Sequence, residues 1–302
     1  MGSLRYNLTL LLSNILFGAS FSVYVSLLRG ALSFEQLFAL QLLFSTIVFT
    51  PLALGQRNFF RLSLNDFGSI FIVALLVVFG WWYLLIAGAS YANPIDASTI
   101  TTIGPIFTII TSIIANSRKV GRGEGLGMIV ALLGVIVILV DRGKSLIDKG
   151  GEGYGNALIL CAVMAIAVNT VLITPVLRRH GAVVVMGWYY IIGSLLAMPL
   201  LVEAIPQIPQ IELSVIDIVE IGYILLLGSA LPVYLLYVSA EHLTAVHTAV
   251  YRYIQPIMAT SLAVWRGQTT IDRTNIVGAA LIFLGMLCAI ISTPRNELTT
   301  HE

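Results

Sequence analysis

The stretch LLVVFGWWYLLIAGA at residues 75–89 aligns with LLGSALPVYLLYVSA at residues 226–240 when the chain is shifted against itself by 151 positions. The same register continues without a gap, so that residues 75–140 match residues 226–291. Both copies are strongly apolar, and each carries the tripeptide Tyr-Leu-Leu at the same place. Self-similarity over this length predicts that two copies of one structural unit build the fold.

This register also pairs residues that shape and pack helices. The pairs are Tyr83 with Tyr234, Pro105 with Pro256, Gly127 with Gly278, and Gly134 with Gly285. A shift of 148 positions adds Pro51 with Pro199. The two copies are therefore predicted at residues 1–145 and 146–302, joined in one membrane domain. The two glycines of each copy are seven residues apart, so they share a helix face and favour close helix packing over lining a transport pathway.

Composition places the chain in a membrane. Hydrophobic residues make up 58% of its 302 residues and charged residues 10%, and the mean hydropathy is +0.95, outside the range of water-soluble domains. A helix needs roughly 20 apolar residues to cross a hydrocarbon layer of roughly 30 Å. Ten apolar stretches approach that length, at residues 8–28, 35–54, 67–89, 94–115, 125–140, 154–177, 182–202, 217–240, 244–265 and 274–292. Because they are continuously apolar, they predict an all-α membrane protein with ten transmembrane helices and not a barrel.

Five helices per copy is an odd number, so the second copy must enter the membrane from the opposite side to the first. The sequence thus predicts two inverted five-helix repeats, a construction common in secondary transporters. A duplicated membrane scaffold is the alternative. An even total places both termini on one side, and nine Lys and Arg residues lie on that side against six on the other. This bias favours cytoplasmic termini, with insertion in both orientations as the alternative.

The charged residues indicate neither a nucleic-acid partner nor an enzyme. The net charge is +1, and the chain has no large basic cluster. It has no Cys/His ligand spacing, no GxSxG elbow and no paired carboxylates at membrane depth, so we expect no metal, no cofactor and no catalytic activity. Cys161 and Cys288 lie in apolar stretches and are predicted to be buried thiols. The first apolar stretch is predicted to be a transmembrane helix and not a cleaved signal peptide.

Arg252 is the outlier among the polar residues of the apolar stretches. It lies near the middle of residues 244–265, where an arginine costs roughly 2.5–3.5 kcal/mol on insertion scales. The polar residues of this stretch share one face that spans about 140° of the helix. They are Thr244, His247, Thr248, Tyr251, Arg252 and Gln255. We interpret Arg252 as a fork that binds a carboxylate or other anion. The alternative is a structural arginine satisfied by helix carbonyls and water.

Prolines interrupt the two helices that correspond to each other in the repeat. Pro256 follows the polar face of the ninth stretch, and Pro105 occupies the matching place in the fourth. Each proline lacks an N–H and frees a carbonyl one turn earlier, which makes both candidate hinges. The fourth stretch also has a polar face, with Ser98, Thr101, Thr102 and Thr108. Two interrupted, polar-striped helices in corresponding positions predict a substrate site between them.

Other candidate residues complete this predicted site. Tyr83 and Tyr234 are repeat counterparts well inside their stretches, so we expect them to line a cavity. His247 is the better candidate for proton coupling and Asp96 the weaker one, since no acidic residue lies at mid-membrane. Asn14 and Asn169 are interpreted as helix-to-helix hydrogen bonders.

With a proline in the fourth and ninth helices and glycine pairs in the fifth and tenth, this inverted repeat resembles the drug/metabolite transporter superfamily in its EamA-like branch. The resemblance runs from about Leu8 to Ile291. It implies an inner-membrane carrier that exports small metabolites from a prokaryotic cytoplasm, with amino acids, including aromatic ones, among its cargoes. It also implies a cavity lined by the third, fourth, eighth and ninth helices. Relatives commonly place an acidic and then a basic residue after the fourth-helix proline, but residues 115–119 and 266–269 lack the acid.

The resulting hypothesis is a carrier that moves a small metabolite across the bilayer by alternating access, as a monomer or homodimer. An amino acid is the first expected substrate. Arg252 would bind its carboxylate, Tyr251, Gln255, Tyr83 and Tyr234 would line the cavity, and Thr101 and Ser98 would supply hydrogen bonds. The alternatives are an exporter of drugs or other cationic compounds and, less favoured, a channel or scaffold.

Overall fold

The computed structural model describes residues 2–116, 121–142, 151–240, 251–252 and 254–292. Within these ranges the chain is built from helices and contains no strand. The helices of the first copy are α1 (Gly2–Gly30), α2 (Phe34–Leu54), α3 (Leu64–Ala74), η1 (Leu75–Tyr83), α4 (Leu84–Ala89), α5 (Pro94–Thr101), α6 (Gly104–Asn116) and α7 (Arg122–Arg142).

The second copy follows the same order. Its helices are α8 (Glu152–His180), α9 (Ala182–Leu196), α10 (Met198–Ala204), η2 (Ile205–Gln210), α11 (Val215–Gly222), η3 (Tyr223–Ala230), α12 (Leu231–Ala240), α14 (Ile254–Trp265) and α15 (Arg273–Ser292). Residues 251–252 are also helical. All ten predicted stretches are therefore helical within the described residues, the ninth from residue 251 onward.

Helix length and composition give fewer membrane crossings than the repeat predicts. Six helical segments of the described residues are long and apolar enough to cross a bilayer. A seventh is obtained if α9 is joined with the segment Met198–Gln210, although the two are bent by 69°. The fold class, a helical membrane protein with two repeats, is thus confirmed, whereas the count of ten crossings stays a prediction.

Equivalent capping sequences start corresponding helices in the two copies. The Ser63 hydroxyl accepts a hydrogen bond of 3.1 Å from the backbone N–H of Asp66 at the start of α3. Ser214 and Asp217, 151 positions further on, make the same contact at 3.2 Å at the start of α11. Each of these helices continues into a π-helical segment, η1 or η3. Since π-helix is rare in proteins, its presence in both copies is a strong structural sign of the repeat.

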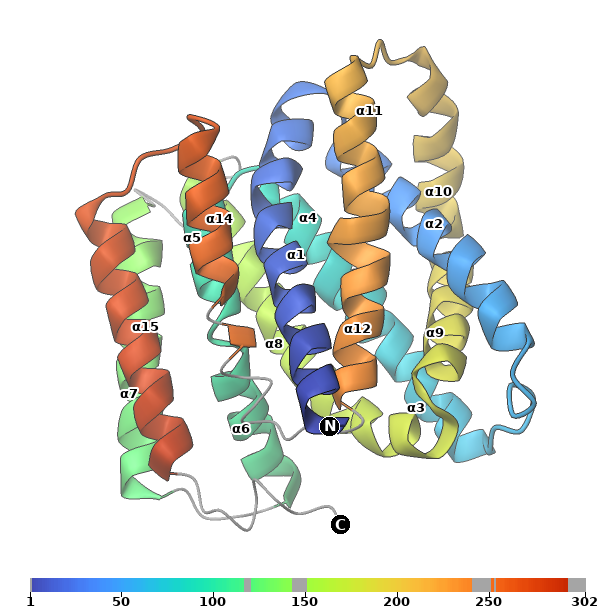
Figure 1. Cartoon of the computed structure of the whole chain (residues 1–302), viewed down its shortest axis with the longest axis horizontal. Helices are drawn as coiled ribbons and strands as arrows, with labels where there is room; N and C mark the ends of the chain where they lie inside the picture. The colour runs from blue at the N-terminus through green and yellow to red at the C-terminus, as the bar shows by residue number, and fades with distance from the viewer. Residues whose placement is uncertain (1, 117–120, 143–150, 241–250, 253, 293–302) are drawn as a thin grey trace.

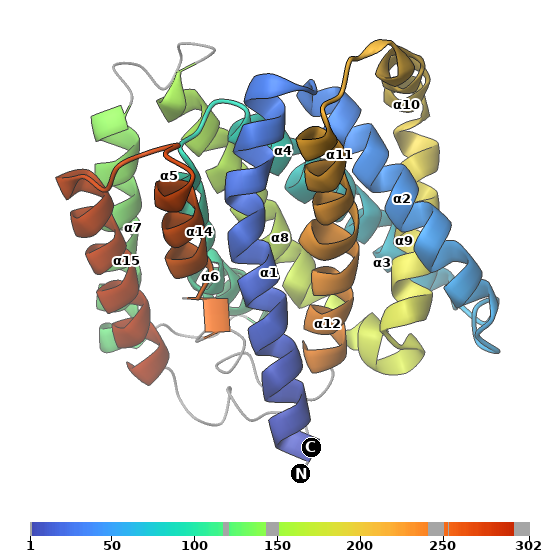
Figure 2. The ribbon, with the colours of Figure 1, turned by 45° about the horizontal axis from the view of Figure 1, so that its top comes forward.

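The counterpart helices α7 and α15 pack against each other through their glycines, at one end of the molecule (Figures 1 and 2). A Cβ atom added to Gly127 would lie 2.5 Å from the carbonyl oxygen of Gly285. One added to Gly134 would lie 2.8 Å from the carbonyl oxygen of Gly278. These contacts join the start of one helix to the end of the other, so the two counterparts are antiparallel, as an inverted repeat requires.

The fourth predicted helix is interrupted where its proline indicates. Helix α5 ends at Thr101, and α6 begins at Gly104, immediately before Pro105. Because Pro105 has no N–H to donate and its ring displaces the carbonyl of Thr101, the helix cannot continue regularly through this point.

The outer surface of the bundle is apolar, with Ile47 70% and Leu133 49% exposed. The prediction of buried thiols was wrong, since Cys161 and Cys288 are both exposed on this surface.

Candidate substrate site

Arg252 extends its side chain to the interruption between α5 and α6. The Cβ position of Gly104, at the start of α6, would lie 3.3 Å from Nη1 of Arg252 and 3.6 Å from Cγ1 of Val163 in α8. Arg252 itself is half-buried. A side chain at position 104 would therefore compete with the guanidinium for space, and the glycine leaves that space open.

The guanidinium has neither an ion-pair nor a hydrogen-bond partner within the part of the chain that the structure describes. A cation inside a helical bundle normally pairs with a carboxylate or with backbone carbonyls, because its desolvation is costly. Its planar fork of N–H donors matches the two oxygens of a carboxylate. The geometry therefore leaves Arg252 able to bind an anionic ligand group.

Gln255 and Thr101, two other predicted ligand residues, are bonded to the protein itself. The Gln255 amide nitrogen donates to Oδ1 of Asn14 at 2.8 Å, and the Thr101 hydroxyl lies 3.4 Å from the Gln255 amide oxygen. Asn14 in turn donates to the Leu10 carbonyl at 2.8 Å. This buried bridge joins α1, α5 and α14 next to Arg252. Ser98 donates to the Ile95 carbonyl at 2.9 Å within its own helix.

Asp96 and its neighbours tie the start of α5 to the end of the chain. The Asp96 carboxylate is fully buried and accepts a hydrogen bond of 2.6 Å from the amide of Asn275 in α15. Asn93, the cap of α5, donates to Thr269 at 2.7 Å. His247, the other candidate for proton coupling, lies outside the described residues, so proton coupling through either residue stays a prediction.

Tyr83 and Tyr234 pack against different parts of α2 and are not brought together. The Tyr83 ring meets Phe38 edge-on, with 5.4 Å between ring centroids. Tyr234 lies 6.5 Å from Phe49. Since eleven residues separate the two phenylalanines, the tyrosines contact points about 16 Å apart along α2. Tyr251 is half-buried, and Pro256 lies in the first turn of α14.

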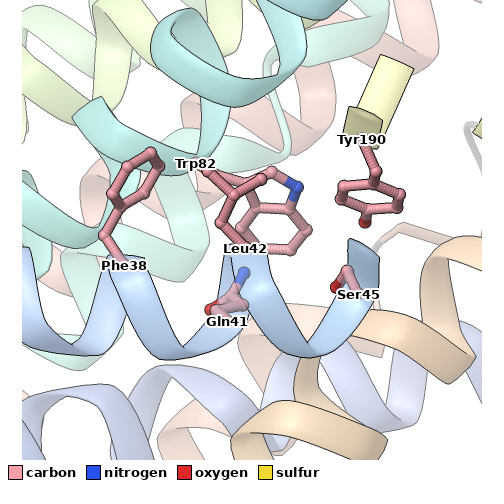
Figure 3. A pocket seen from close by; sticks show the side chains of 6 residues that line it. All are labelled: Phe38, Gln41, Leu42, Ser45, Trp82 and Tyr190. Atoms are coloured by element: carbon pink, nitrogen blue, oxygen red, sulfur yellow. The ribbon is translucent and has the colours of Figure 1, made fainter. Parts of the chain in front are cut away.

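Between these two tyrosines, α2, η1 and α9 enclose a small cavity, which we name the Tyr190 cavity (Figure 3). It is lined by Phe38, Gln41, Leu42, Ser45, Trp82 and Tyr190. The cavity has a volume of about 10 Å³. Behind the cavity the Tyr24 hydroxyl donates to the Gln41 amide oxygen at 2.7 Å, and the Tyr190 ring stacks on Phe49 at 5.6 Å. The walls are thus aromatic, and a few polar groups face inward.

The sequence prediction missed Gln41, Ser45 and Tyr190. A signal was present, because positions 38, 41, 42 and 45 share one face of a helix and two of them are polar in an apolar stretch. The partner face, with Tyr190, comes from the second copy and is 145 residues away from Ser45 in the chain.

An acidic partner for Arg266 is present, although the residues after the ninth-helix proline supply none. Arg266 pairs with Glu220 of α11 and donates to the Ser26 hydroxyl of α1 at 3.2 Å. The side chains are 21% and 9% exposed. This ion pair joins α1, α11 and the end of α14 at the face of the bundle where α1 ends, so the acid comes from another helix.

A helical membrane domain made of two inverted copies, with a cation and an aromatic-walled cavity inside the bundle, has the architecture of a secondary transporter. The chain belongs to the EamA-like transporter family, which matches residues 4–140 and residues 153–291, one segment in each copy. It is accordingly a multi-pass membrane transporter. The resemblance drawn from the sequence is confirmed by this match.

Similar proteins support the same class without naming a substrate. An uncharacterized transporter of Archaeoglobus fulgidus is 25% identical over 168 residues, 56% of each chain, so this chain spans little more than half of that relative. The uncharacterized transporter YetK of Bacillus subtilis is 21% identical over 248 residues, 81% of this chain and 72% of that protein. A solved crystal structure with 18% identity has a TM-score of 0.65 and covers 97% of this chain and 98% of its own, which shows a shared fold.

Proposed function

We propose that this transporter exports amino acids across the inner membrane by alternating access, with both termini in the cytoplasm. The observation that carries this proposal is the position of Arg252. Its guanidinium lies at the interruption of α5 and α6, next to Gly104 and without a carboxylate partner among the described residues. The substrate carboxylate would supply the missing counter-charge.

The backbone at the interruption is largely bonded to itself. The N–H groups of Ile106 and Phe107 donate to the Ile103 carbonyl at 2.9 and 3.4 Å, and the Ile103 N–H donates to the Ile100 carbonyl at 3.1 Å. Pro105 has no N–H to offer a ligand. The guanidinium of Arg252 is therefore the group at this break that supports binding of the substrate carboxylate.

Aromatic rings around α2 support an amino acid with a large apolar side chain. Phe38, Trp82 and Tyr190 form walls of the Tyr190 cavity, and Phe49 and Tyr189 lie directly behind. Aromatic surfaces favour apolar and aromatic ligand groups through burial and ring packing. Substrates with small hydrophilic side chains gain less from such walls.

Binding to purified protein tests this proposal directly, because a ligand of the folded state raises its apparent thermal stability. Amino acids, their methyl esters and their decarboxylated amines are titrated against wild type, Arg252→Ala and, as a matched control, Arg273→Ala. Arg273 is an exposed residue at the start of α15. We expect stabilisation that needs the free carboxylate, is lost in Arg252→Ala and is kept in Arg273→Ala. Equal stabilisation in all three proteins would refute the role of Arg252, and counterflow in liposomes then measures the transport itself.

Export of cationic aromatic compounds is a second candidate function, favoured by the same aromatic walls. Trp82 and Tyr190 could bind an organic cation over their ring faces. The buried carboxylate of Asp96 lies in the first turn of α5, but it already accepts a hydrogen bond from Asn275. Stabilisation by organic cations that does not change in Arg252→Ala would favour this candidate over amino acids. A channel or scaffold would show neither saturation nor counterflow.

A further inference from the structure

Polar groups converge inside the Tyr190 cavity without bonding to one another. Ser45 and Tyr190 are each 1% exposed, and neither hydroxyl has a hydrogen-bond partner of normal geometry. Figure 3 shows the Tyr190 hydroxyl directed toward Ser45 and the indole nitrogen of Trp82 on the side that faces Tyr190. A buried hydroxyl without a partner costs about 1–3 kcal/mol. Two such hydroxyls beside an indole N–H, around one small space, indicate that another polar atom belongs there.

The Gln41 side chain adds a hydrogen-bond donor to the cavity, and Tyr24 of α1 fixes the orientation of its amide. Its amide oxygen accepts the hydrogen bond from Tyr24, a fully packed tyrosine of α1. This bond fixes the amide so that its nitrogen, a group that only donates, lies on the side of Trp82 (Figure 3). The lining therefore offers two groups that only donate, Gln41 Nε2 and Trp82 Nε1, and two hydroxyls that adapt. None of the six lining residues is charged.

The size of the cavity sets what it holds. A cavity volume of about 10 Å³ is the room that one water molecule needs. A buried water is retained where two to four polar partners surround it. The Tyr190 cavity meets both conditions. In this conformation it has room for a single oxygen atom.

We infer that the Tyr190 cavity is an oxygen-recognition site for substrate, in which a hydroxyl or carbonyl oxygen on an apolar ring replaces a resident water. Because the site belongs to the carrier proposed above, its assignment rests on that function and narrows it to substrates that carry such an oxygen on their apolar part. Two fixed donors demand an acceptor atom, which an ammonium group lacks. The ring itself needs more space than one water, so it enters when the aromatic walls of α2, η1 and α9 separate.

The Tyr190 cavity should discriminate between ligands with and without this oxygen, because leaving its buried hydroxyls unpaired costs free energy. A ligand without the oxygen would expel the water and bury the Ser45 and Tyr190 hydroxyls against its ring. Sites that hydrogen-bond a ligand hydroxyl reject the analogue lacking it far more strongly than apolar pockets reject a missing methylene. We therefore expect the cavity to bind a phenol more tightly than a phenyl ring.

Two ligand pairs test this inference on the full-length purified protein. L-tyrosine is compared with L-phenylalanine, and tyramine with phenethylamine, by titrating thermal stabilisation. We expect the hydroxylated member of at least one pair to bind about tenfold more tightly than its partner in wild type. In Ser45→Ala and Tyr190→Phe the difference should fall to about twofold, since one of the hydrogen bonds is lost. Tyr91→Phe, which changes a tyrosine packed on Tyr154 outside the cavity, should keep the full difference.

The outcomes separate this inference from the proposed function. Equal binding within both pairs in wild type, or no stabilisation by any of the four ligands, would overturn the oxygen site. A hydroxyl preference in the tyramine pair together with no effect of the carboxylate would keep the oxygen site and refute the amino-acid proposal. The wild-type comparison needs no mutant, so it holds even if Tyr190→Phe fails to fold.

Discussion

Thr46 is hydrogen-bonded to its own counterpart in the repeat. Its hydroxyl oxygen lies 2.7 Å from that of Ser194, and the two residues are 148 positions apart, the same shift that pairs Pro51 with Pro199. A residue can contact its symmetry equivalent only near the symmetry axis. The contact between α2 and α9 therefore marks the pseudo-twofold axis that relates the two copies.

Removing this hydrogen bond should lower the free energy of unfolding only slightly. The effects of substituting Thr46 and Ser194 should nevertheless be coupled, because either substitution breaks the same bond. Thr46→Val, Ser194→Ala and the double variant form a cycle, and we expect a coupling energy of about 0.6 kcal/mol. Reversible unfolding in detergent measures it. Strictly additive single-variant effects would contradict the hydrogen bond, and Ser69→Ala, an exposed serine of α3 that bonds within its own helix, controls for the loss of a hydroxyl.

Gly127→Ala should destabilise the protein by about 2 kcal/mol, because the new Cβ would collide with the backbone of α15 and no rotamer can relieve it. Gly68→Ala is the matched control, since a Cβ there meets nothing within 4 Å. That control should be neutral or slightly stabilising, as alanine is the better helix former. Thermal unfolding of both variants distinguishes them, and equal melting temperatures would argue against the glycine contact.

Glu220→Gln should destabilise the protein by about 2 kcal/mol, because Arg266 would keep its charge and lose its carboxylate in a largely buried place. Glu203→Gln, an exposed glutamate at the end of α10, should change the free energy of unfolding by less than about 0.5 kcal/mol. If the two variants unfold alike, the Arg266 ion pair contributes no more than a surface charge.

Gly104→Val should weaken amino-acid binding by about tenfold or more, since the added side chain would occupy the space of the Arg252 guanidinium and displace it. The protein should still insert and purify as a single species. Gly68→Val, in open surroundings, serves as the control. Unchanged ligand affinity in Gly104→Val would show that the guanidinium does not need its present position to bind substrate.

The sequence allowed the helices and their repeat to be predicted because both depend on local composition. Apolar length and the break at Pro105 are properties of single segments, and the shift of 151 positions needs only a comparison of two segments letter by letter. The site was harder, because it depends on how helices rotate against one another. Arg252 was identifiable by its charge alone, whereas the bonds of Gln255 and Thr101 to Asn14 and each other required the packing of three helices. Ser45 and Tyr190 became a site only when the two copies met.

The glycine contact between α7 and α15 has a consequence for the order of synthesis. Helix α7 closes the first copy, and its packing partner is the last helix of the described chain, more than 130 residues later. At typical translation rates of about 5–20 residues per second, the partner of the α7 glycine face is made about 7–26 seconds later. During this interval it faces lipid or the insertion machinery. Among the described helices, the last to be made therefore completes a packing contact that the first copy alone leaves open.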